Sequence, residues 1–474
     1  MHFATLQFGY FLALTLTVSW LLRSRPRAHK AFLLFASYYF YSRLNVGLSA
    51  LLLSSSFLNF WLGEFAHSPS RWLPRKVAMW TAVALNLGLL GVFKYYGFFR
   101  DIAQDVAEKL SLEAHLPLLE WALPVGISFF TFQGLSYVVD LAQRRGIRAQ
   151  SLLDFLLFIA YFPKLLMGPI CRSRDLLPQL AQAPPARVLD LSAAMALLAS
   201  GLFKKAVIAT LLGTRLVDDA FFAPENHSFS ALLMAAYAYS IQLYCDFSGY
   251  TDMARGVSLL LGYKLPENFE NPYAATDLGL FWRRWHATFS SWLRDYVYFP
   301  LGGSRGSNAR TFFNMIFTFT LSGLWHGASF GYLLWGFAHG VGLCVHKVIK
   351  DGRRSVGLLG REPIWYVFLG WAVTFHFVVF SRIVFKAADL ETARDFVVRL
   401  FSWTSDGKPL DAWVLVFSLW GLLLNWVGAP LKKGFIHLQE RLPQPARPVL
   451  WLLVAIAILA LKPGDVAPYI YSQF

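Results

Sequence analysis

The sequence predicts an all-α protein that crosses a membrane many times, and three observations support this fold class. Hydrophobic residues make up 56% of the 474-residue chain, and the mean hydropathy is +0.46. Charged residues make up 15%, whereas about a quarter of the residues in a typical soluble domain are charged. Apolar runs of about 18 residues, the length that crosses a bilayer, recur from the first residues to the last. Residues 1–474 are therefore expected to form a single polytopic transmembrane domain.

The basic composition is explained by the same class of protein. Lys and Arg number 43 against 28 Asp and Glu, which gives a formal net charge of +15. In membrane proteins, positive residues accumulate in cytoplasmic loops, where they face anionic lipids. Membrane lipids, and not nucleic acid, are therefore the expected partner of this charge.

The charges of the short loops predict the topology of the first five spans. The apolar run at residues 5–22 is followed by a basic cluster, 23–30, and is not preceded by one. It is therefore expected to be a first membrane helix with its N-terminus outside, and not a removable signal peptide. The next runs alternate between basic loops and an acidic loop at 100–120, and they lie at 31–42, 46–66, 77–99 and 121–141.

The alternation breaks at residues 152–167. This run is barely long enough to cross, and Arg172 and Arg174 after it indicate the inside again. A re-entrant segment is the simplest interpretation, and non-helical backbone at membrane depth survives only when it is buried in protein or lines a watery cavity. An ordinary span with atypical loop charges is the alternative, because the charge rule is only a bias. The next span is expected at 191–212.

A second irregular region lies between two basic boundary residues, Arg310 and Lys347. Two short apolar stretches flank the sequence S-G-L-W-H-G, which predicts a helical hairpin that enters and leaves the membrane from the cytoplasmic side. His326 follows Arg310 by 16 residues, or roughly 24 Å along a helix, so we expect it at the hairpin turn, at or beyond the midplane. Three later spans are expected at 364–385, 412–427 and 449–461.

The densest group of aromatic and basic residues lies at 277–303. On a single helix the aromatic side chains would share one stripe, with His286 at its edge and Arg283 and Arg284 elsewhere on the wheel. The pattern fits an interfacial anchor, and it also fits an electropositive vestibule for an anionic donor such as coenzyme A, because arginine suits phosphate. The stripe comprises Trp282, Trp285, Phe289, Trp292 and Tyr296.

Other charged side chains lie within apolar stretches. Asp246, Asp252 and Arg255 follow one another in such a stretch, where carboxylates usually pair or line a cavity. A structural Asp–Arg or Asp–Tyr pair is the favoured interpretation. Lys204 and Lys205 interrupt the preceding span and are expected to snorkel, with a contact to phosphate as the alternative.

A histidine at membrane depth is a functional candidate, because it needs polar partners there. The imidazole of His326 suits the removal of a proton from a hydroxyl group. A packed structural histidine is the competing interpretation, and the hairpin break, the nearby glycines and the re-entrant segment weigh against it. His339 and His346 lie on the returning helix, but a zinc site needs a third ligand and none is evident, so no metal is expected.

These residues also carry a resemblance to a known family. The sequence resembles the membrane-bound O-acyltransferases (MBOATs), specifically the bacterial branch of the alginate O-acetyltransferase membrane subunit and the related teichoic acid D-alanyltransferase. Seven blocks match in order across nearly the whole chain, and the ending P-Y-I-Y-S-Q-F (468–474) is similar to the alginate-type ending. The blocks are L-P-V-G-I-S-F-F-T-F-Q (123–133), Y-F-P-K-L-L-M-G-P-I (161–170), D-F-S-G-Y-T-D-M-A (246–254), L-P-E-N-F-E-N-P-Y (265–273), F-W-R-R-W-H (281–286), R-D-Y-V-Y-F-P-L-G-G (294–303) and L-S-G-L-W-H-G-A (321–328).

The resemblance implies a ring of transmembrane helices with re-entrant segments around a central tunnel. It implies that His326, from the W-H-G block, is the catalytic histidine and that His286, from R-R-W-H, is a second functional histidine. The residues expected to bind the acyl donor are Arg283, Arg284, Trp285 and Lys204.

The resemblance further implies an O-acyltransferase that moves an acetyl group from cytoplasmic acetyl-CoA across the bacterial inner membrane to an extracytoplasmic polysaccharide. A periplasmic partner, such as an SGNH-type acetyltransferase, is expected to complete the transfer. Alginate, cellulose, peptidoglycan and other exopolysaccharides all stay open as acceptors. The D-alanyl branch offers an alternative donor, the thioester of a carrier protein.

Two interpretations from other functional classes stay open. A polar cavity with an intramembrane histidine also fits a transporter that passes a small solute and relays protons. Transporters often show internal repeats, and the sequence shows none. An inert scaffold that holds a periplasmic transferase is the second alternative.

Overall fold

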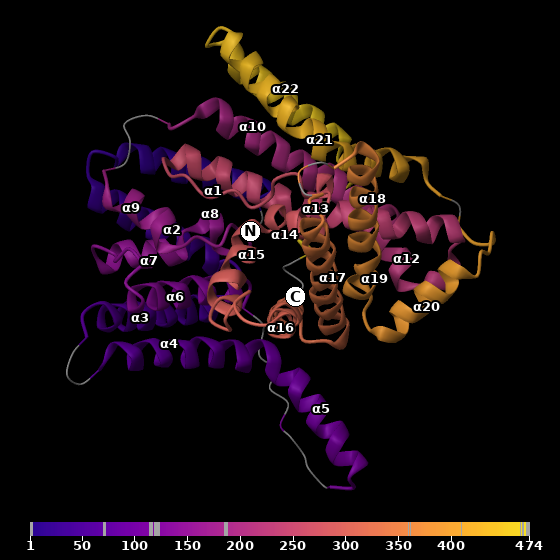
Figure 1. Cartoon of the computed structure of the whole chain (residues 1–474). Coiled ribbons are helices and arrows are strands. Elements are labelled where there is room, and N and C mark those ends of the chain that lie inside the picture. The colour runs from indigo at the N-terminus through magenta and orange to yellow at the C-terminus, as the bar shows by residue number, and fades with distance from the viewer. Residues whose placement is uncertain are drawn as a thin grey trace. The chain divides into compact units, whose positions relative to one another are not determined.

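The computed structural model describes residues 3–69, 73–112, 117, 124–183, 188–358, 360, 362–408, 410–464, 466 and 469–470 (Figure 1). Across these residues the regular elements are helices, and extended chain pairs only in an isolated bridge between His227 and Lys408. Six of the described helices are long and apolar enough to cross a membrane. The prediction of an all-α polytopic membrane protein is therefore confirmed.

The chain divides into two compact units, each built from two separate stretches. Unit 1 comprises Met1–Leu191 and Val257–Pro266, and unit 2 comprises Ser192–Gly256 and Glu267–Phe474. Because each unit combines two separate stretches of the chain, neither unit is a domain formed by one continuous stretch of sequence. The expectation that residues 1–474 act as one transmembrane domain stays a prediction.

In unit 1 the first apolar runs form helices that begin at side-chain caps. Thr5 accepts a hydrogen bond from the Phe8 amide at the start of α1, and Asn45 accepts from Gly47 and Leu48 at the start of α3. Helix α3 packs against α4 and α6 (Figure 1). The helices of unit 1 are α1 (Leu6–Leu21), α2 (Pro26–Ser42), α3 (Val46–His67), α4 (Arg75–Leu90), η1 (Gly91–Tyr95), α5 (Tyr96–Lys109), α6 (Ile127–Ala142), α7 (Leu152–Ala160), α8 (Phe162–Leu165) and α9 (Ser173–Ala181).

The fourth span is longer than the sequence predicted. A single helical path, 35 residues from Arg75 to Lys109, includes the first part of the segment expected to be an acidic loop. No proline interrupts it, so the backbone hydrogen bonds continue. At about 1.5 Å per residue the path is about 52 Å long, so it extends past a hydrocarbon core of about 30 Å. Its last part, α5, leaves the other helices of unit 1 in Figure 1. Glu113 and Glu120 of the expected loop, and Trp121 at the expected start of the next span, lie outside the described residues.

The segment expected to be re-entrant is a broken helix. α7 ends at Ala160, the next residue, Tyr161, has backbone angles of φ −51° and ψ 107°, and the short helix α8 follows. Pro163 cannot donate to the carbonyl of Ile159, and the Lys164 ammonium donates to that carbonyl instead, at 3.4 Å. Residues 154–173 are all buried within the protein. Irregular backbone of this kind is compatible with membrane depth, and re-entrance itself stays a prediction.

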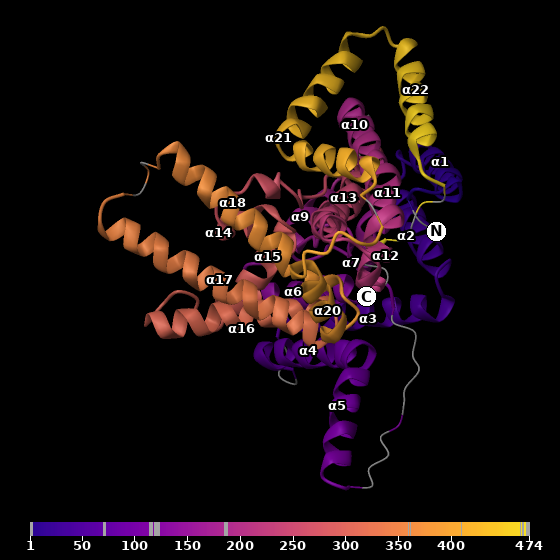
Figure 2. The same cartoon turned by 90° about the vertical axis from the view of Figure 1, so that its right-hand side faces the viewer.

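Unit 2 contains the predicted hairpin. Helices α16 and α17 pack along each other, and the chain turns between them at Gly327–Ser329, so the predicted helical hairpin is confirmed (Figure 2). The helices of unit 2 are α10 (Leu191–Leu202), η2 (Phe203–Ala209), α11 (Thr210–Leu212), η3 (Gly213–Val217), α12 (Asp218–Phe222), η4 (Pro224–Asn226), α13 (Phe229–Leu261), η5 (Pro272–Ala274), α14 (Leu278–Arg284), α15 (Ala287–Leu293), η6 (Arg294–Tyr298), α16 (Asn308–His326), α17 (Phe330–Ser355), α18 (Ile364–Ser381), α19 (Ile383–Lys386), α20 (Leu390–Phe401), α21 (Ala412–Arg441) and α22 (Ala446–Leu461), with α10 and α13 each crossing a unit boundary.

The Trp-rich stretch is not the single helix that the sequence predicted. It forms α14, α15 and η6, and the chain breaks at His286, which adopts a left-handed backbone conformation with φ 45°. Two backbone hydrogen bonds to the irregular segment 268–270 stabilise the break. The Ala287 amide donates to the Asn268 carbonyl at 2.9 Å, and the Glu270 amide donates to the Arg284 carbonyl at 3.0 Å. A helical wheel does not show this tertiary pairing. The aromatic side chains are nevertheless mostly core residues: Trp282, Trp285, Phe289 and Trp292 are buried, and Tyr296 is half-buried.

Candidate active site

His326 is the last residue of α16, at the tip of the hairpin, as predicted. Its side chain is 3% exposed and is enclosed by aromatic rings. The ring centroids lie 4.7 Å away for Trp325, 5.2 Å for Trp335, 5.1 Å for Phe385 and 6.1 Å for Phe289. The helix ends there because the chain becomes extended at Gly327.

The structure brings His286 to the same cluster of rings. The imidazole of His286 lies 5.9 Å from the Trp325 ring and 5.0 Å from the Phe289 ring, both of which also contact His326. His286 is fully buried and lies outside the six candidate spans, and burial lowers the pKa of its imidazole to about 3. The side chain is therefore neutral. Two histidines that the sequence places 40 residues apart thus share one aromatic cluster.

A polar stripe runs along α16 to His326. Asn314, Thr318, Ser322 and His326 are spaced by four residues, which places them on one helix face, and all four are buried. Among the residues that the structure describes, neither the Thr318 hydroxyl nor the Ser322 hydroxyl has a hydrogen-bond partner. Buried polar groups normally have a hydrogen-bond partner. The lack of one within the described protein therefore indicates that a polar ligand can bind these two hydroxyls.

A basic groove adjoins the other end of this stripe. The groove has a volume of about 490 Å³, and Thr318 lines it together with residues of α14, η6 and the last turns of α17. One acidic side chain, Asp351, lines it and pairs with Lys347. The cationic side chains that line the groove are Arg283, Arg294, Lys347, Lys350 and Arg354. Such a concentration of guanidinium and ammonium groups suits phosphate.

Arg283 is thus the one of the four expected donor-binding residues that lines the groove. Trp285 is 3% exposed and packs in the core, where the guanidinium of Arg382 lies 4.3 Å from its ring. Arg284 is half-buried and is not among the residues that line the groove. Lys204 pairs with Asp252 at 2.8 Å and is largely buried. This geometry favours structural roles for Trp285 and Lys204.

The expected partners of the buried aspartates were wrong. Asp246 pairs with Lys205, and Asp252 pairs with Lys204, in place of the Asp–Arg or Asp–Tyr pairs that the sequence favoured. Arg255 forms its ion pair with Glu267 instead, at 2.9 Å. The lysines lie on η2 and the aspartates on α13, so the pairing depends on how two helices face each other and not on sequence proximity.

His339 belongs to the wall of the site, and both of its ring nitrogens make hydrogen bonds. The Trp282 indole N–H can only donate, so its 3.3 Å contact makes Nδ1 of His339 an acceptor. Nε2 of neutral His339 then carries the proton and donates to Ser381 Oγ at 3.1 Å. His339 is thereby satisfied and packs against Trp335, which contacts His326.

Sequence reasoning missed several residues of the site. Trp335 and Phe385 contact His326, Asn268 contacts His286, and Lys350 and Arg354 line the groove. The four-residue spacing on α16 was a readable signal for the polar stripe, and Asn268 stands in one of the matched blocks. The contact with Phe385 had no sequence signal, because it joins helices that are far apart in the chain.

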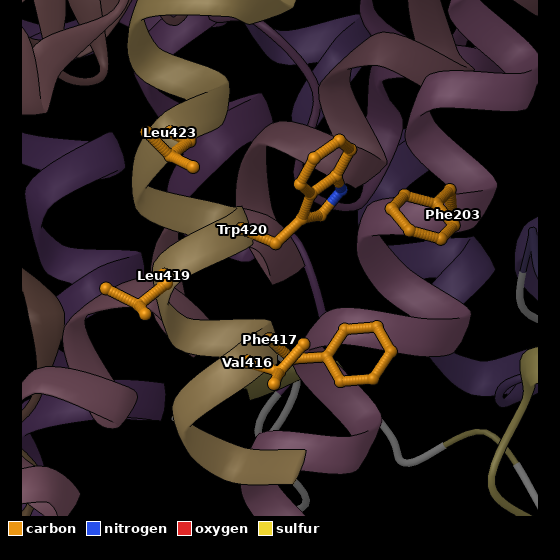
Figure 3. A pocket seen from close by; sticks show the side chains of 6 residues that line it. All are labelled: Phe203, Val416, Phe417, Leu419, Trp420 and Leu423. Carbon is orange, nitrogen blue, oxygen red and sulfur yellow. The ribbon is translucent and has the colours of Figure 1, made fainter. Parts of the chain in front are cut away.

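A second groove has the opposite character. Figure 3 shows the side chains that line it, one from η2 and five from α21, and all are hydrophobic. The indole N–H of Trp420 is the polar group among them, so this groove fits hydrocarbon better than a phosphate or a sugar. The lining residues are Phe203, Val416, Phe417, Leu419, Trp420 and Leu423.

Comparison with known proteins gives the class of protein. The sequence model of the MBOAT, membrane-bound O-acyltransferase family matches residues 118–385, which is more than half of the chain. The "Probable alginate O-acetylase AlgI" of Pseudomonas syringae pv. tomato is 36% identical over 80% of this chain and 71% of the relative. The "Peptidoglycan O-acetyltransferase" of Helicobacter pylori is 32% identical over 78% of this chain and 73% of the relative. The "Teichoic acid D-alanyltransferase" of Bacillus subtilis is 30% identical over 55% of this chain and 68% of the relative.

A polytopic all-α membrane protein with two histidines buried in one aromatic cluster, and with a polar stripe that runs from a basic groove to one of them, fits a membrane-embedded group-transfer enzyme. The chain belongs to the membrane-bound O-acyltransferase family, and it is an O-acyltransferase. The resemblance drawn from the seven sequence blocks is thereby confirmed.

Proposed function

We propose that the protein moves an acetyl group from cytoplasmic acetyl-CoA across the bacterial inner membrane for the O-acetylation of an extracytoplasmic polysaccharide. His326 and His286 serve the chemistry, and a periplasmic SGNH-type transferase receives the group or passes it to the polymer. The observation that carries the proposal is the polar stripe of α16, which leads from the basic groove to His326.

The groove and the stripe match the parts of a coenzyme A thioester. Cations at the groove suit the phosphates of the nucleotide. The hydroxyls of Thr318 and Ser322 suit the amides of the pantetheine arm, because they are buried and have no hydrogen-bond partner among the described residues. From Thr318 to His326 the helix rises about 12 Å, so a donor that fills the groove reaches the histidine with an extended arm.

The charge pattern supports the direction of transfer. Lys347, Lys350 and Arg354 stand in the last turns of α17, and His326 stands at the opposite end of the hairpin. Because positive residues accumulate on the cytoplasmic side, the groove opens to the cytoplasm. The basic cluster at 23–30, after the first apolar run, supports an N-terminus outside by the same rule.

The chemistry requires a base and a thioester. An acceptor hydroxyl loses its proton to an imidazole and attacks the thioester carbonyl, and the thiolate of coenzyme A leaves and takes up a proton. His326 acts as that base, or it accepts the acetyl group transiently and releases it to the hydroxyl. Relatives named for alginate and for peptidoglycan leave the polysaccharide open among cell-envelope polymers.

The test is acetylation in cells with His326→Ala at normal membrane abundance. Acetylation is expected to fall by at least about 100-fold, the contribution of a general base. His437→Ala, an exposed histidine of α21, is the matched control and is expected to retain activity. Full acetylation with His326→Ala would reject the catalytic assignment.

A carrier-protein thioester is the second candidate donor, because the basic lip of the groove also suits an acidic carrier protein and because a teichoic acid D-alanyltransferase is among the relatives. The two donors are separated by supplying purified protein with acetyl-CoA alone. Release of coenzyme A thiol and a labelled acetyl product support acetyl-CoA, and turnover only with a charged carrier protein supports the alternative.

A further inference from the structure

We propose that Asn268 is a positioning residue that fixes the proton of His286 on Nδ1 and so presents Nε2 as a hydrogen-bond acceptor to the reaction. The inference rests on the proposed function only in that His286 takes part in the transfer. It adds the tautomer of His286 and the residue that sets it.

The orientation of the Asn268 amide is fixed by its neighbours. One side-chain atom of Asn268, Oδ1, lies 3.3 Å from the backbone nitrogen of Thr288 and 2.8 Å from the Thr288 hydroxyl. The backbone nitrogen can only donate, so the atom that faces it is the carbonyl oxygen and not the amide nitrogen. A flipped amide would set two donors against each other.

This assignment decides the tautomer of His286. The same Oδ1 lies 3.1 Å from Nδ1 of His286, and a carbonyl oxygen only accepts. Nδ1 therefore carries the proton. Because burial keeps the imidazole neutral, Nε2 holds the lone pair and is the nitrogen able to accept a proton.

Asn268 also holds the strained break between α14 and α15. Its backbone carbonyl accepts from the Ala287 amide at 2.9 Å, beside His286 in its left-handed conformation. Asn268 is 1% exposed, so it is part of the rigid core. A side chain that accepts several hydrogen bonds could serve only to stabilise the fold. The experiment must therefore separate this structural role from the positioning of His286.

Asn268→Asp separates them. The carboxylate accepts from the same three donors and supports the fold, but its charge favours the protonated imidazole and raises the pKa of His286. A base must be deprotonated to act, so the rise of activity with pH moves to higher pH by about one unit or more. Asn268→Leu removes the acceptor and is expected to lower kcat by about 100-fold with little change in KM for acetyl-CoA.

Thr288→Val is the matched control. It removes one hydrogen bond to the same Oδ1 but leaves the backbone amide and the contact to His286 in place. Its pH profile is expected to match that of the unaltered protein. The probe is thiol release from acetyl-CoA by the full chain in nanodiscs, together with thermal unfolding of each variant. The range runs from about pH 3 to pH 9, because burial lowers the pKa of His286 to about 3 in the unaltered protein.

The outcomes distinguish the inference from the proposed function. An unchanged pH profile in Asn268→Asp, in protein that unfolds at the usual temperature, overturns the positioning role even if Asn268→Leu fails to fold. If His326→Ala is inactive while both Asn268 variants resemble the unaltered protein, only this inference fails. If His326→Ala is fully active, the catalytic assignment fails regardless of Asn268.

Discussion

At the scale of single residues, this protein keeps ionised side chains inside its core. Lys205 and Asp246 are 2% and 1% exposed, and Asp246 also accepts a hydrogen bond from the Ile470 amide at 2.8 Å. Burying two charges is costly, and the pair is tolerated because each neutralises the other. The pair therefore ties the end of the described chain to the core of unit 2.

Removing one member of this pair should destabilise the protein strongly. Asp246→Ala leaves the Lys205 ammonium without its carboxylate, and we expect a loss of about 3–5 kcal/mol of stability. Thermal unfolding in detergent measures the loss. The double variant Lys205→Met with Asp246→Leu is expected to recover most of it, and no recovery would contradict the explanation. Glu267→Gln, which breaks the more exposed pair with Arg255, is the control and is expected to cost about 1 kcal/mol or less.

The positive charge of the groove is expected to strengthen the binding of the acyl donor. Lys350→Glu is expected to raise KM for acetyl-CoA about tenfold or more, since a charge-assisted hydrogen bond contributes about 1.5 kcal/mol or more, and to leave kcat little changed. Initial rates over a range of acetyl-CoA concentrations measure both constants. Lys433→Glu, on the exposed side of α21, is the same change of charge away from the groove. Equal increases in KM in the two variants would contradict the proposal that the groove binds the donor.

At the scale of elements, close packing of the hairpin sets the place of His326. A Cβ on Gly336 would overlap the carbonyl oxygen of Phe319, and one on Gly323 would overlap that of Tyr332. Small residues at such contacts let helix backbones approach closely, as membrane helices often do. The position of the histidine at the tip therefore depends on Gly323, less than one turn before it, and on Gly336 of the returning helix.

Gly336→Ala tests this dependence. We expect a loss of about 1–3 kcal/mol of stability because the added methyl group forces α16 and α17 apart. Gly352→Ala, in the same helix but with open space around it, is expected to be neutral or slightly stabilising, since alanine favours a helix. Thermal unfolding measures the stability of both variants. A loss in Gly336→Ala alone supports close packing, and equal changes in both variants would point to helix propensity instead.

At the scale of the whole molecule, the proposal places the basic end of α17 in the cytoplasm and the far end of α5 outside. Ser111→Cys is therefore expected to react with a membrane-impermeant maleimide in intact spheroplasts, and Gly352→Cys only after the membrane is opened. The three native cysteines, Cys171, Cys245 and Cys344, are buried and give a low background. Labelling of Gly352→Cys in sealed spheroplasts would reverse the topology.

The features of the whole molecule that could be predicted from the sequence are those that depend on local sequence patterns. Apolar runs identified the helices that are long and apolar enough to cross a membrane, and the sequence S-G-L-W-H-G marked the hairpin turn with His326 at its tip. The length of the helix that ends at Lys109 was misjudged, because acidic residues were taken as a loop although nothing in that stretch prevents a helix. Charge distribution predicts sidedness, but it does not end a helix.

What the sequence alone determined is the class of protein, the long apolar helices and the hairpin with His326 at its tip, because each follows from composition, local spacing or an ordered block. What only the tertiary structure decided is the break at His286, the lysine partners of Asp246 and Asp252, and the groove built from α14, η6, α16 and α17. These features join segments that are distant in the chain. Their energies come from hydrogen bonds, ion pairs and ring contacts that exist only once the helices are packed, so no local pattern encodes them.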